Sequence, residues 1–246
     1  MSVDLNCDLG EGAGHDAELM RLITSANVAC GAHAGDATTM RATIALAQRR
    51  GVAVGAHPGF ADREHFGRRE ISLSSRELGK LVAGQIVALC EWGAVRHVKP
   101  HGALYNLAAR DRTVADVIAS AVQAIDPALI LFGLAGSELV RAGRAQGLRV
   151  AEEVFADRTY RRDGSLTPRT DEGALIASED AAVAQVLRMV HEGVVRATDG
   201  TDVTIRADTI CLHGDSAHAV DFAQRIQAGL ETAGVEIKPF GAANGR

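Results

Sequence analysis

The sequence has no basic tract and no long apolar run, and these absences exclude broad classes of protein. The formal net charge is −5, and the densest basic segments are the pairs Arg68-Arg69 and Arg161-Arg162. A nucleic-acid-binding surface needs a larger basic stripe, so we expect no nucleic acid partner. No apolar stretch reaches the roughly 18 residues that a membrane-spanning helix needs. Because residues 1–5 also lack the basic and apolar regions of a secretory signal, we expect a cytoplasmic protein with no membrane partner.

Paired cysteines and the common nucleotide-binding motifs are missing as well. The four cysteines, Cys7, Cys30, Cys90 and Cys211, show no CxxC spacing, which favours free thiols that pack as small apolar groups. No GxxxxGKS or GxxxxGKT segment occurs, so any nucleotide would bind without a P-loop. The absence of GxGxxG after a strand and of GxSxG argues against a Rossmann dinucleotide site and an α/β-hydrolase.

Short apolar runs alternate with amphipathic segments along the chain, which is typical of a parallel α/β fold. Several runs are nearly continuous in apolar residues, as expected of strands that are buried on both faces. The predicted strands are Val3–Asn6, Ala26–Cys30, Val52–His57, Val95–Lys99, Leu129–Leu134, Leu148–Val154 and Thr209–His213. About seven such units favour an irregular parallel (β/α) barrel that occupies residues 1–246 as a single domain. A doubly wound open sheet is the structural alternative.

Helix starts are marked by residues that commonly cap helices. Asp36 can cap one helix, and Ser74 with Glu77 forms a capping box before the next. The remaining predicted helices begin at Thr113, Ser137, Ser178 and about Ser216. Two segments interrupt this rhythm, a long polar loop over residues 157–177 and a small hairpin near residues 194–205.

Polar residues gather immediately after the predicted strands. In chain order they are Asn6, Asp8, Glu11, Asn27, His33, Asp36, His57, Lys99, His101, Asp157, Arg158, His213 and Asp215. A parallel barrel brings the carboxyl ends of all its strands to one face, so residues that are distant in sequence should converge there. No comparable cluster precedes the strands.

Each of these residues also has a purely structural interpretation. A single histidine at a strand end is more often hydrogen-bonded and structural than catalytic, and Asp36 can serve only as a helix cap. A purely structural role is less convincing for the whole set, because four histidines and several carboxylates share one predicted rim at the carboxyl ends of the strands. Such a rim can bind a divalent metal that activates water, or supply a general acid and base around an amide carbonyl. Lys99 beside them can stabilise an oxyanion or a phosphate.

The sequence does not identify a metal. A tight zinc site is disfavoured because the thiols lie inside predicted strands and not in paired loop motifs. A weaker divalent site that uses Asp8 and the histidines stays open.

Several longer segments carry a resemblance, in order from Asp4 to about Ile237. They are DLNCDLGEG (4–12), ITSANVACGAHAGD (23–36), GAHPGF (55–60), FGRR (66–69), HVKPHGALYN (97–106), GLAGSE (133–138), EVFADRTYRRDGSLTPR (153–169) and CLHGD (211–215). With these segments the sequence resembles the LamB/YcsF family. The coverage makes the resemblance far more specific than any one short motif.

The resemblance implies a fold related to the glycoside hydrolase/deacetylase superfamily. It also implies ATP-dependent cleavage of 5-oxoproline (pyroglutamate) to L-glutamate, carried out together with the B and C subunits of a 5-oxoprolinase. ATP would be the cofactor, with Mg²⁺ accompanying its phosphates. A five-membered lactam is an unactivated amide with a poor leaving group, so phosphorylation of its carbonyl oxygen would make the carbon easier for water to attack.

We predict a reactive core of Asp8, His57, His101 and His213. The residues predicted to bind or orient the substrate or ATP are Asn6, Glu11, Asn27, His33, Lys99 and Asp215, together with Arg158 and Arg169 from the long loop. A purely structural salt bridge is an equal alternative for each arginine. Two rival functions stay open, a stand-alone metal-dependent amidohydrolase or deacetylase and a non-catalytic ligand-binding subunit.

Overall fold

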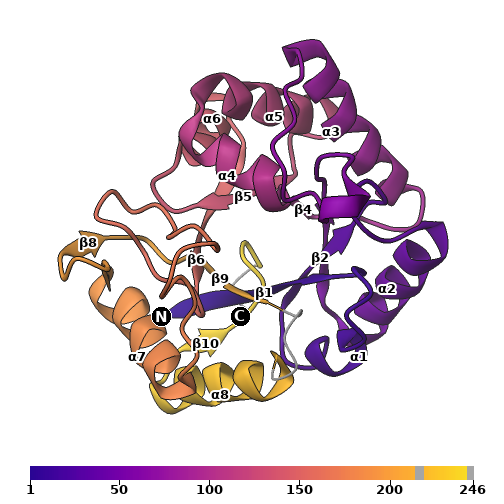
Figure 1. Ribbon diagram of the computed structural model, residues 1–246. Helices are drawn as coiled ribbons and strands as arrows, with labels where there is room; N and C mark the ends of the chain where they lie inside the picture. Colours follow the sequence, from indigo (N-terminus) through magenta and orange to yellow (C-terminus); the bar gives the residue numbers. More distant parts are fainter. Residues whose placement is uncertain (214–218, 243–246) are drawn as a thin grey trace.

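Seven parallel strands close into a barrel in the computed structural model, which describes residues 1–213 and 219–242 (Figure 1). In order around the ring they are β1 (Ser2–Leu9), β2 (Ser25–Ala29), β3 (Ala53–His57), β4 (His97–Val98), β5 (Ile130–Leu134), β6 (Arg149–Phe155) and β9 (Thr209–Leu212). The ring closes because β9 pairs with β6 on one side and with β1 on the other. The predicted parallel barrel of about seven strands is therefore confirmed, and the alternative of an open sheet is wrong.

Two further strand pairings lie outside the ring. β10 (Glu236–Ile237) runs parallel to the first residues of β1, just before the stretch of β1 that pairs with β9. β7 (Val194–Arg196) and β8 (Asp202–Thr204) form an antiparallel pair within the segment predicted as a hairpin. β10 was not predicted, because a strand of two residues is too short to stand out as an apolar run.

Helices surround the barrel on its outside (Figure 1). They are α1 (Asp16–Leu19), α2 (Ala37–Arg50), α3 (Ser75–Cys90), α4 (Gly102–Arg110), α5 (Arg112–Ile125), α6 (Glu138–Ala145), α7 (Glu179–Glu192) and α8 (Ala219–Thr232), with the 3-10 helix η1 (Arg63–His65). The predicted caps are confirmed: the Asp36 side chain accepts a hydrogen bond from the Thr39 N–H, and Ser74 forms the capping box before α3. The predicted helix start at Ser216 lies outside the described residues.

α4 is a helix that the sequence pattern did not indicate. It begins directly after Pro100-His101, a segment that is typical of a loop. Gly102 starts the helix with a φ of 53°, and a Cβ there would lie 2.8 Å from the Gly67 carbonyl oxygen, so the position requires glycine. The short turn fixes His101 at the end of the barrel between β4 and α4.

The main apolar core lies between the strands and the helices, while the inside of the barrel combines polar side chains with a small apolar cluster of Ile130, Phe132 and Ala151. β1 shows this division, because successive side chains of a strand point to opposite faces. Leu5 and Leu9 belong to the hydrophobic core, whereas Asp4, Asn6 and Asp8 form hydrogen bonds with polar groups of other strands. No helix in the described part of the chain is long and apolar enough to cross a membrane.

His97 shows how closely the barrel interior is packed. Its ring lies against Gly55 of the neighbouring strand, where a Cβ would come within 2.0 Å of His97 Nε2. Nε2 donates a hydrogen bond to Asn27 Oδ1 at 2.8 Å, and the ring stacks on Phe132 with centroids 4.2 Å apart. Burial lowers the pKa of His97 to about 3, so the ring is neutral in the folded protein at physiological pH.

Replacing His97 with Gln should make the protein less sensitive to acid. The unfolded histidine has a pKa near 6.5 and the folded one a pKa of about 3, so the unfolded state binds the extra proton between these values and stability rises with pH. Gln lacks this proton but can still donate to Asn27. The variant is expected to be less stable than the wild type at pH 7.5. This difference in unfolding free energy should shrink by about 2 kcal/mol when the pH falls from 7.5 to 5, because only the wild type loses stability to protonation of His97. Urea unfolding at both pH values measures it, and an unchanged deficit would contradict a neutral buried ring.

Candidate active site

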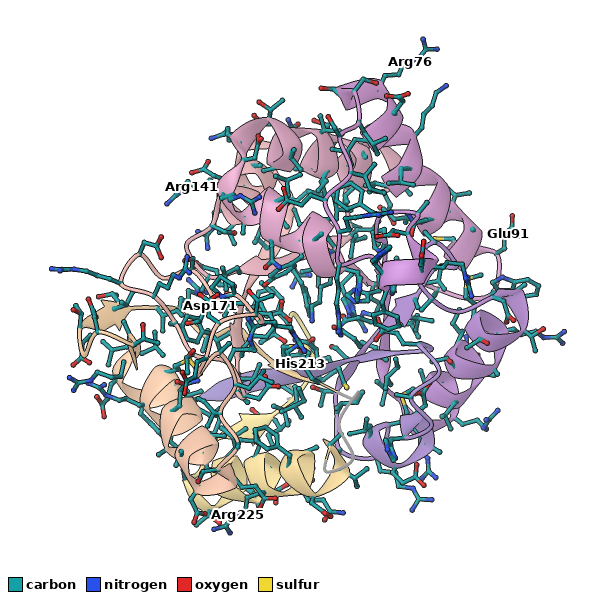
Figure 2. All side chains as sticks on the ribbon, in the orientation of Figure 1. Arg76, Glu91, Arg141, Asp171, His213 and Arg225 are labelled. Atoms are coloured by element: carbon teal, nitrogen blue, oxygen red, sulfur yellow. The ribbon has the colours of Figure 1, made fainter. Side chains whose placement is uncertain are left out.

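A cavity of about 810 Å³ opens where the barrel strands end. The predicted residues that line it are Asp8, Glu11, His57, Lys99, His101, Arg158, Arg169 and His213. Figure 2 shows His213 near the centre of the ring of helices, whereas Arg76, Glu91 and Arg225 project from its outer edge. The structure thus brings together side chains that follow widely separated strands. Asp215 lies outside the described residues.

Lys99 is a buried cation at the base of this cavity. Its Nζ lies 2.9 Å from Asp8 Oδ1, 2.8 Å from Glu153 Oε1 and 3.1 Å from Cys211 Sγ. Burial lowers the pKa of Lys99, but the facing acidic groups, Asp8 foremost, hold that pKa well above its usual value. Burial raises the pKa of Asp8, but His57 and Lys99 hold it well below the usual range. Lys99 and Asp8 are therefore a charged pair.

Asn6 and Asn27 lie beneath the cavity and do not line it. The Asn27 amide donates hydrogen bonds to Asp8 Oδ1 at 2.8 Å and to Asn6 Oδ1 at 2.7 Å. The Asn6 amide donates to Glu153 Oε1 at 3.0 Å, and Lys99 Nζ donates to Asn6 Oδ1 at 3.2 Å. Both asparagines are fully buried. They hold the two carboxylates in place, and their predicted role in binding the substrate or ATP stays a prediction.

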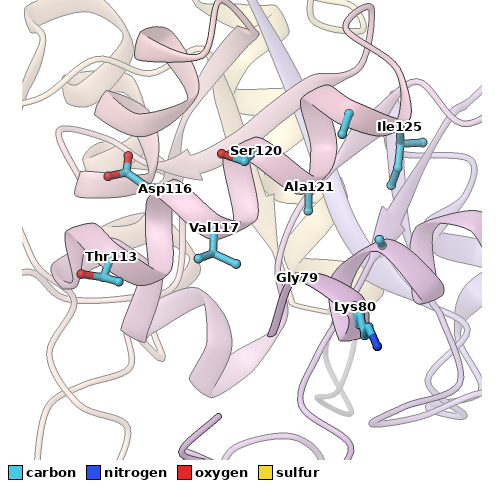
Figure 3. Close-up of a pocket in the computed structure, with 10 residues that line it drawn as sticks. Gly79, Lys80, Thr113, Asp116, Val117, Ser120, Ala121 and Ile125 are labelled. Atoms are coloured by element: carbon cyan, nitrogen blue, oxygen red, sulfur yellow. The ribbon is translucent and has the colours of Figure 1, made fainter. Parts of the chain in front are cut away.

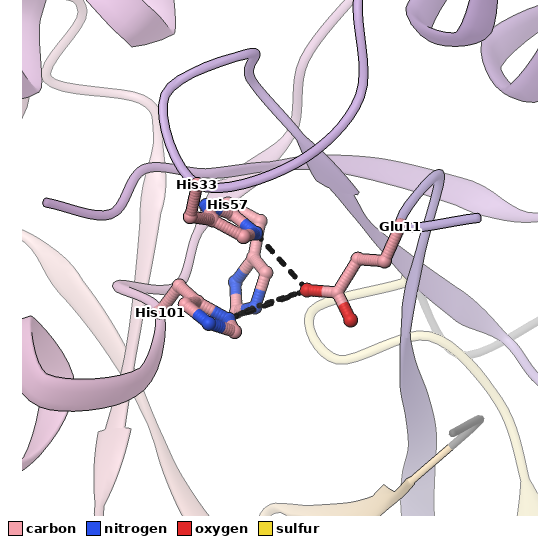
Figure 4. Close-up of side chains that lie close together, drawn as sticks. All are labelled: Glu11, His33, His57 and His101. Carbon is pink, nitrogen blue, oxygen red and sulfur yellow. Dashed lines mark hydrogen bonds and ion pairs between the residues drawn. The ribbon is translucent and has the colours of Figure 1, made fainter. Parts of the chain in front are cut away.

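Three histidines, His33, His57 and His101, face the Glu11 carboxylate (Figure 4). Glu11 Oε1 lies 3.0 Å from His33 Nε2, 3.8 Å from His57 Nε2 and 3.3 Å from His101 Nδ1. One ligand-type atom from each of the four side chains lies within 4.8 Å of the others, so the set is able to hold a metal ion. The weaker divalent site that uses Asp8 and the histidines stays a prediction, whereas this converging set contains Glu11 in place of Asp8. We call these four residues the Glu–His cluster.

The three histidines of the Glu–His cluster differ in how easily they take up a proton. Burial, followed by the charge of His57, lowers the pKa of His33 and of His101 to about 3. Burial also lowers the pKa of His57, but the Asp8 carboxylate outweighs it and the net pKa is raised. Asp8 Oδ2 lies 3.3 Å from His57 Nε2. Burial raises the pKa of Glu11. His57 is thus the ring on which positive charge is most stable, and His33 and His101 are neutral.

The opposite wall of the cavity combines His213 with the long loop. His213 Nδ1 lies 2.8 Å from both carboxylate oxygens of Asp157. Arg158 is buried, with its Nη2 donating to the Thr167 carbonyl oxygen at 2.5 Å, and its Nε has no hydrogen-bond partner among the described residues. Burial, followed by the charge of Arg169, lowers the pKa of Arg158. Two guanidinium groups therefore lie close enough to repel each other at this wall.

Glu153 is an important residue that sequence reasoning missed. It lies within β6, is fully buried, and shares Lys99 with Asp8. The available signal was the pair Glu152-Glu153 among the apolar residues of the strand, where a buried acid must find a cation or give up its charge. The partner could not be read from the sequence, since Lys99 follows a different strand. The cavity is also lined by four arginines outside the predicted set, Arg68, Arg110, Arg141 and Arg161.

A second pocket lies on the outside of the barrel, between α3 and α5 (Figure 3). Most of its lining is apolar or hydroxylic, and Lys80 and Asp116 are its ionisable residues. It has no convergent histidines or carboxylates of the kind that the mouth of the barrel provides. The mouth of the barrel is therefore the candidate active site.

The fold and the site define a closed parallel (β/α) barrel with carboxylates, histidines and a buried lysine where its strands end. The sequence model of the LamB/YcsF family matches residues 3–245. The chain therefore belongs to the LamB/YcsF family.

Individual relatives agree with this assignment. The A subunit of 5-oxoprolinase from Bacillus subtilis (strain 168) is 55% identical over 245 residues, which cover 96% of this chain and 95% of that protein. The crystal structure of a lactam utilization protein from Thermus thermophilus is 47% identical and has a TM-score of 0.91, covering 98% of this chain and 100% of that chain. The Bc1960 peptidoglycan N-acetylglucosamine deacetylase shares 12% identity and a TM-score of 0.50, covering 96% of this chain and 84% of its own. That last likeness concerns the fold alone and agrees with the predicted barrel fold.

Replacing Lys99 with Met should destabilise the protein by about 3–5 kcal/mol, because two carboxylates would be left buried without their cation. Adding Glu153→Gln to Lys99→Met should recover part of this loss by removing one of the uncompensated charges. Chemical denaturation at neutral pH measures the three unfolding free energies. Arg225→Met, which breaks an exposed ion pair with Asp180, is the control and should change stability little. Equal effects of the Lys99 and Arg225 variants would show that Lys99 is not a buried ion-pair partner.

Proposed function

We propose that this chain is the A subunit of a cytoplasmic, ATP-dependent 5-oxoprolinase and supplies the hydrolytic site that opens the lactam ring of 5-oxoproline to give L-glutamate. The observation that carries the proposal is the contact of Asp8 with His57, fixed by the buried ammonium group of Lys99 at the base of a cavity. The 55% identity to a protein named as the A subunit of 5-oxoprolinase supports the choice of substrate.

Ring opening needs a water molecule at the lactam carbonyl carbon and a proton for the departing nitrogen. Glu11 is a suitable base for the water, because burial raises its pKa towards the working pH. His57 and His101 lie beside Glu11 and can orient the same water. As the carbon–nitrogen bond breaks, His213, whose Nδ1 is held by Asp157 and whose ring lines the cavity, is placed to give a proton to the nitrogen. The products are the carboxylate and the amine of glutamate.

ATP would overcome the low reactivity of the lactam. Transfer of the terminal phosphoryl group to the lactam oxygen releases ADP and makes the ring carbon more electrophilic. Water then adds at that carbon, the carbon–nitrogen bond breaks, and a second water releases phosphate from the acyl phosphate. Arg158, Arg161 and Arg169 line the cavity and offer planar guanidinium groups that match phosphate oxygens. The volume of about 810 Å³ lies within the range of roughly 300–1,000 Å³ usual for small-molecule sites.

Arg158 is the arginine best placed to bind an anion. Its side chain is buried, its Nε has no hydrogen-bond partner among the described residues, and the charge of Arg169 is close enough to lower its pKa. A carboxylate or phosphate of the ligand would relieve the repulsion between the two guanidinium groups and accept the remaining N–H. This favours an anionic ligand over a neutral amide.

Replacing Arg158 with Lys should raise the KM for 5-oxoproline or for ATP at least 10-fold, because lysine keeps the charge but loses the planar fork. The kcat should change less, since ground-state binding is the interaction removed. Steady-state kinetics of the complete three-subunit complex measures both parameters. Arg225→Lys, on the outer edge, is the matched control. If neither KM changes in a folded and assembled variant, Arg158 has only a structural role.

The isolated chain should release little or no glutamate from 5-oxoproline, even with ATP and Mg²⁺. It has no recognised nucleotide-binding motif, so activation of the lactam is expected to need the partner subunits. Adding the B and C subunits should restore turnover. Glutamate release and ADP formation, measured with and without the partners, test this expectation. Turnover by the chain alone at the rate of the full complex would refute the need for partners.

A stand-alone metal-dependent amidohydrolase or deacetylase is the second candidate, and the Glu–His cluster is the observation that favours it. Such an enzyme would cleave an amide or N-acetyl substrate without ATP or partners, so the same assay separates the two functions.

A non-catalytic ligand-binding subunit would behave differently again. In that case, replacing Asp8 or His101 would alter ligand affinity and leave the chemical step of the assembled complex unchanged.

A further inference from the structure

The tautomers of two histidines in the Glu–His cluster are fixed by backbone carbonyl groups. His57 Nδ1 lies 2.7 Å from the Lys99 carbonyl oxygen, and His101 Nε2 lies 2.9 Å from the Phe66 carbonyl oxygen. A carbonyl oxygen can only accept, so both of these ring nitrogens carry a hydrogen. In the neutral rings, the lone pairs are therefore on His57 Nε2 and His101 Nδ1, the two atoms that point into the cluster.

These two lone pairs point at each other and at a carboxylate. His57 Nε2 and His101 Nδ1 are 3.0 Å apart, and Glu11 Oε1 lies 3.8 Å and 3.3 Å from them. Asp8 Oδ2 lies 3.3 Å from His57 Nε2. Electron-rich atoms at these separations repel one another unless a positive centre lies among them. One proton can satisfy a single pair of these atoms, whereas a metal cation can satisfy them all.

The spacing of the donor atoms suits a small divalent cation. Bonds of about 2.0–2.1 Å from a tetrahedral ion to nitrogen or oxygen place neighbouring donors about 3.3–3.4 Å apart. The cluster distances of 3.0 Å for Glu11–His33, 3.3 Å for Glu11–His101 and 3.8 Å for Glu11–His57 lie around this value. The hydrogen bonds from His57 and His101 to backbone carbonyls are the outer contacts that usually orient metal-binding histidines.

The four donors come from four consecutive strands of the barrel. Glu11 and His33 follow β1 and β2, His57 ends β3, and His101 lies between β4 and α4. Neighbouring parallel strands hold these side chains in fixed relative positions, so the set is preorganised and little ordering remains for an ion to impose. His33 stacks on His101 with centroids 3.7 Å apart, which further restricts both rings.

We infer that the Glu–His cluster is a binding site for one divalent transition-metal ion, with Glu11 Oε1, His33 Nε2, His57 Nε2 and His101 Nδ1 as ligands. Three imidazole nitrogens and one carboxylate favour Zn²⁺, Co²⁺ or a similar ion over Mg²⁺ and Ca²⁺, which prefer oxygen donors. Glu11, His57 and His101 also line the cavity, so a bound ion is exposed to a ligand there. Metal binding can be measured without substrate, ATP or partners. In the metal-bound form Glu11 would hold the ion and would not act as the base for water proposed above.

Binding of Zn²⁺ and Co²⁺ to the purified full-length chain, freed of any histidine tag and treated with a chelator, tests this inference. Calorimetric titration should show one saturable site with a Kd of micromolar or lower. The Co²⁺ form should show the visible absorption of a four- or five-coordinate ion. Mg²⁺ should bind at least 100-fold more weakly than Zn²⁺. Glutamate release by the full complex is a separate assay, so failure of the proposed function would leave the metal titration interpretable.

Two variants locate the site. Glu11→Gln keeps the size of the side chain and removes its charge, and His101→Gln removes a nitrogen ligand; each should weaken Zn²⁺ binding at least 100-fold. His65→Gln is the control, because His65 is a partly exposed histidine that contacts carboxylates outside the cluster, and its binding curve should match the wild type. If His101→Gln does not fold, Glu11→Gln decides the question. The absence of a saturable one-to-one site for Zn²⁺ and Co²⁺, or unchanged binding in Glu11→Gln, would overturn the inference.

Discussion

The ammonium group of Lys99, enclosed by the barrel, is the constraint on which the rest of the structure depends. A buried unpaired charge is very unfavourable, so the interior must supply anions and hydrogen-bond acceptors to it. Asp8 on β1 and Glu153 on β6 supply the anions, and Cys211 of β9 completes the contact. Lys99 directly follows β4, and none of these three strands neighbours β4 in the ring. Its side chain therefore connects strands from different parts of the barrel. The site at the mouth is the accessible end of this network.

Asp8 connects the stability of the barrel with its chemistry. Its Oδ1 atom accepts hydrogen bonds from Lys99 and Asn27, whereas its Oδ2 atom faces His57. One oxygen thus belongs to the buried network and the other to the cavity. Because the first oxygen fixes the second, the carboxylate reaches His57 in a defined orientation, which is what preorganised catalysis requires. The same arrangement means that changing Asp8 should affect folding as well as the proposed chemistry, so stability must be measured on every variant at this position.

The barrel and most of the site residues could be predicted from the sequence, because strand ends can be recognised locally. His57, Lys99 and His101 follow apolar runs, and parallel topology forces such positions to one face. The sequence could not show how deeply each polar side chain of a strand lies below the cavity. Asn6 lies on the same face of β1 as Asp8, and a two-residue period shows the shared face without showing which side chain is covered. Glu153 was missed because its cation follows another strand, and a long-range ion pair has no local pattern.

Single-turnover kinetics of the assembled complex tests most directly whether the mouth of the barrel carries out the hydrolysis. Complexes that contain either the wild-type chain or His213→Gln would be mixed with saturating ATP and limiting labelled 5-oxoproline, and glutamate would be followed by rapid quench. We predict that the rate constant for glutamate formation falls about 100-fold or more when the proton donor is lost. Assembly and substrate affinity should be preserved, and His65→Gln should behave like the wild type. An unchanged rate constant in a folded, assembled His213 variant would contradict this role of the barrel mouth.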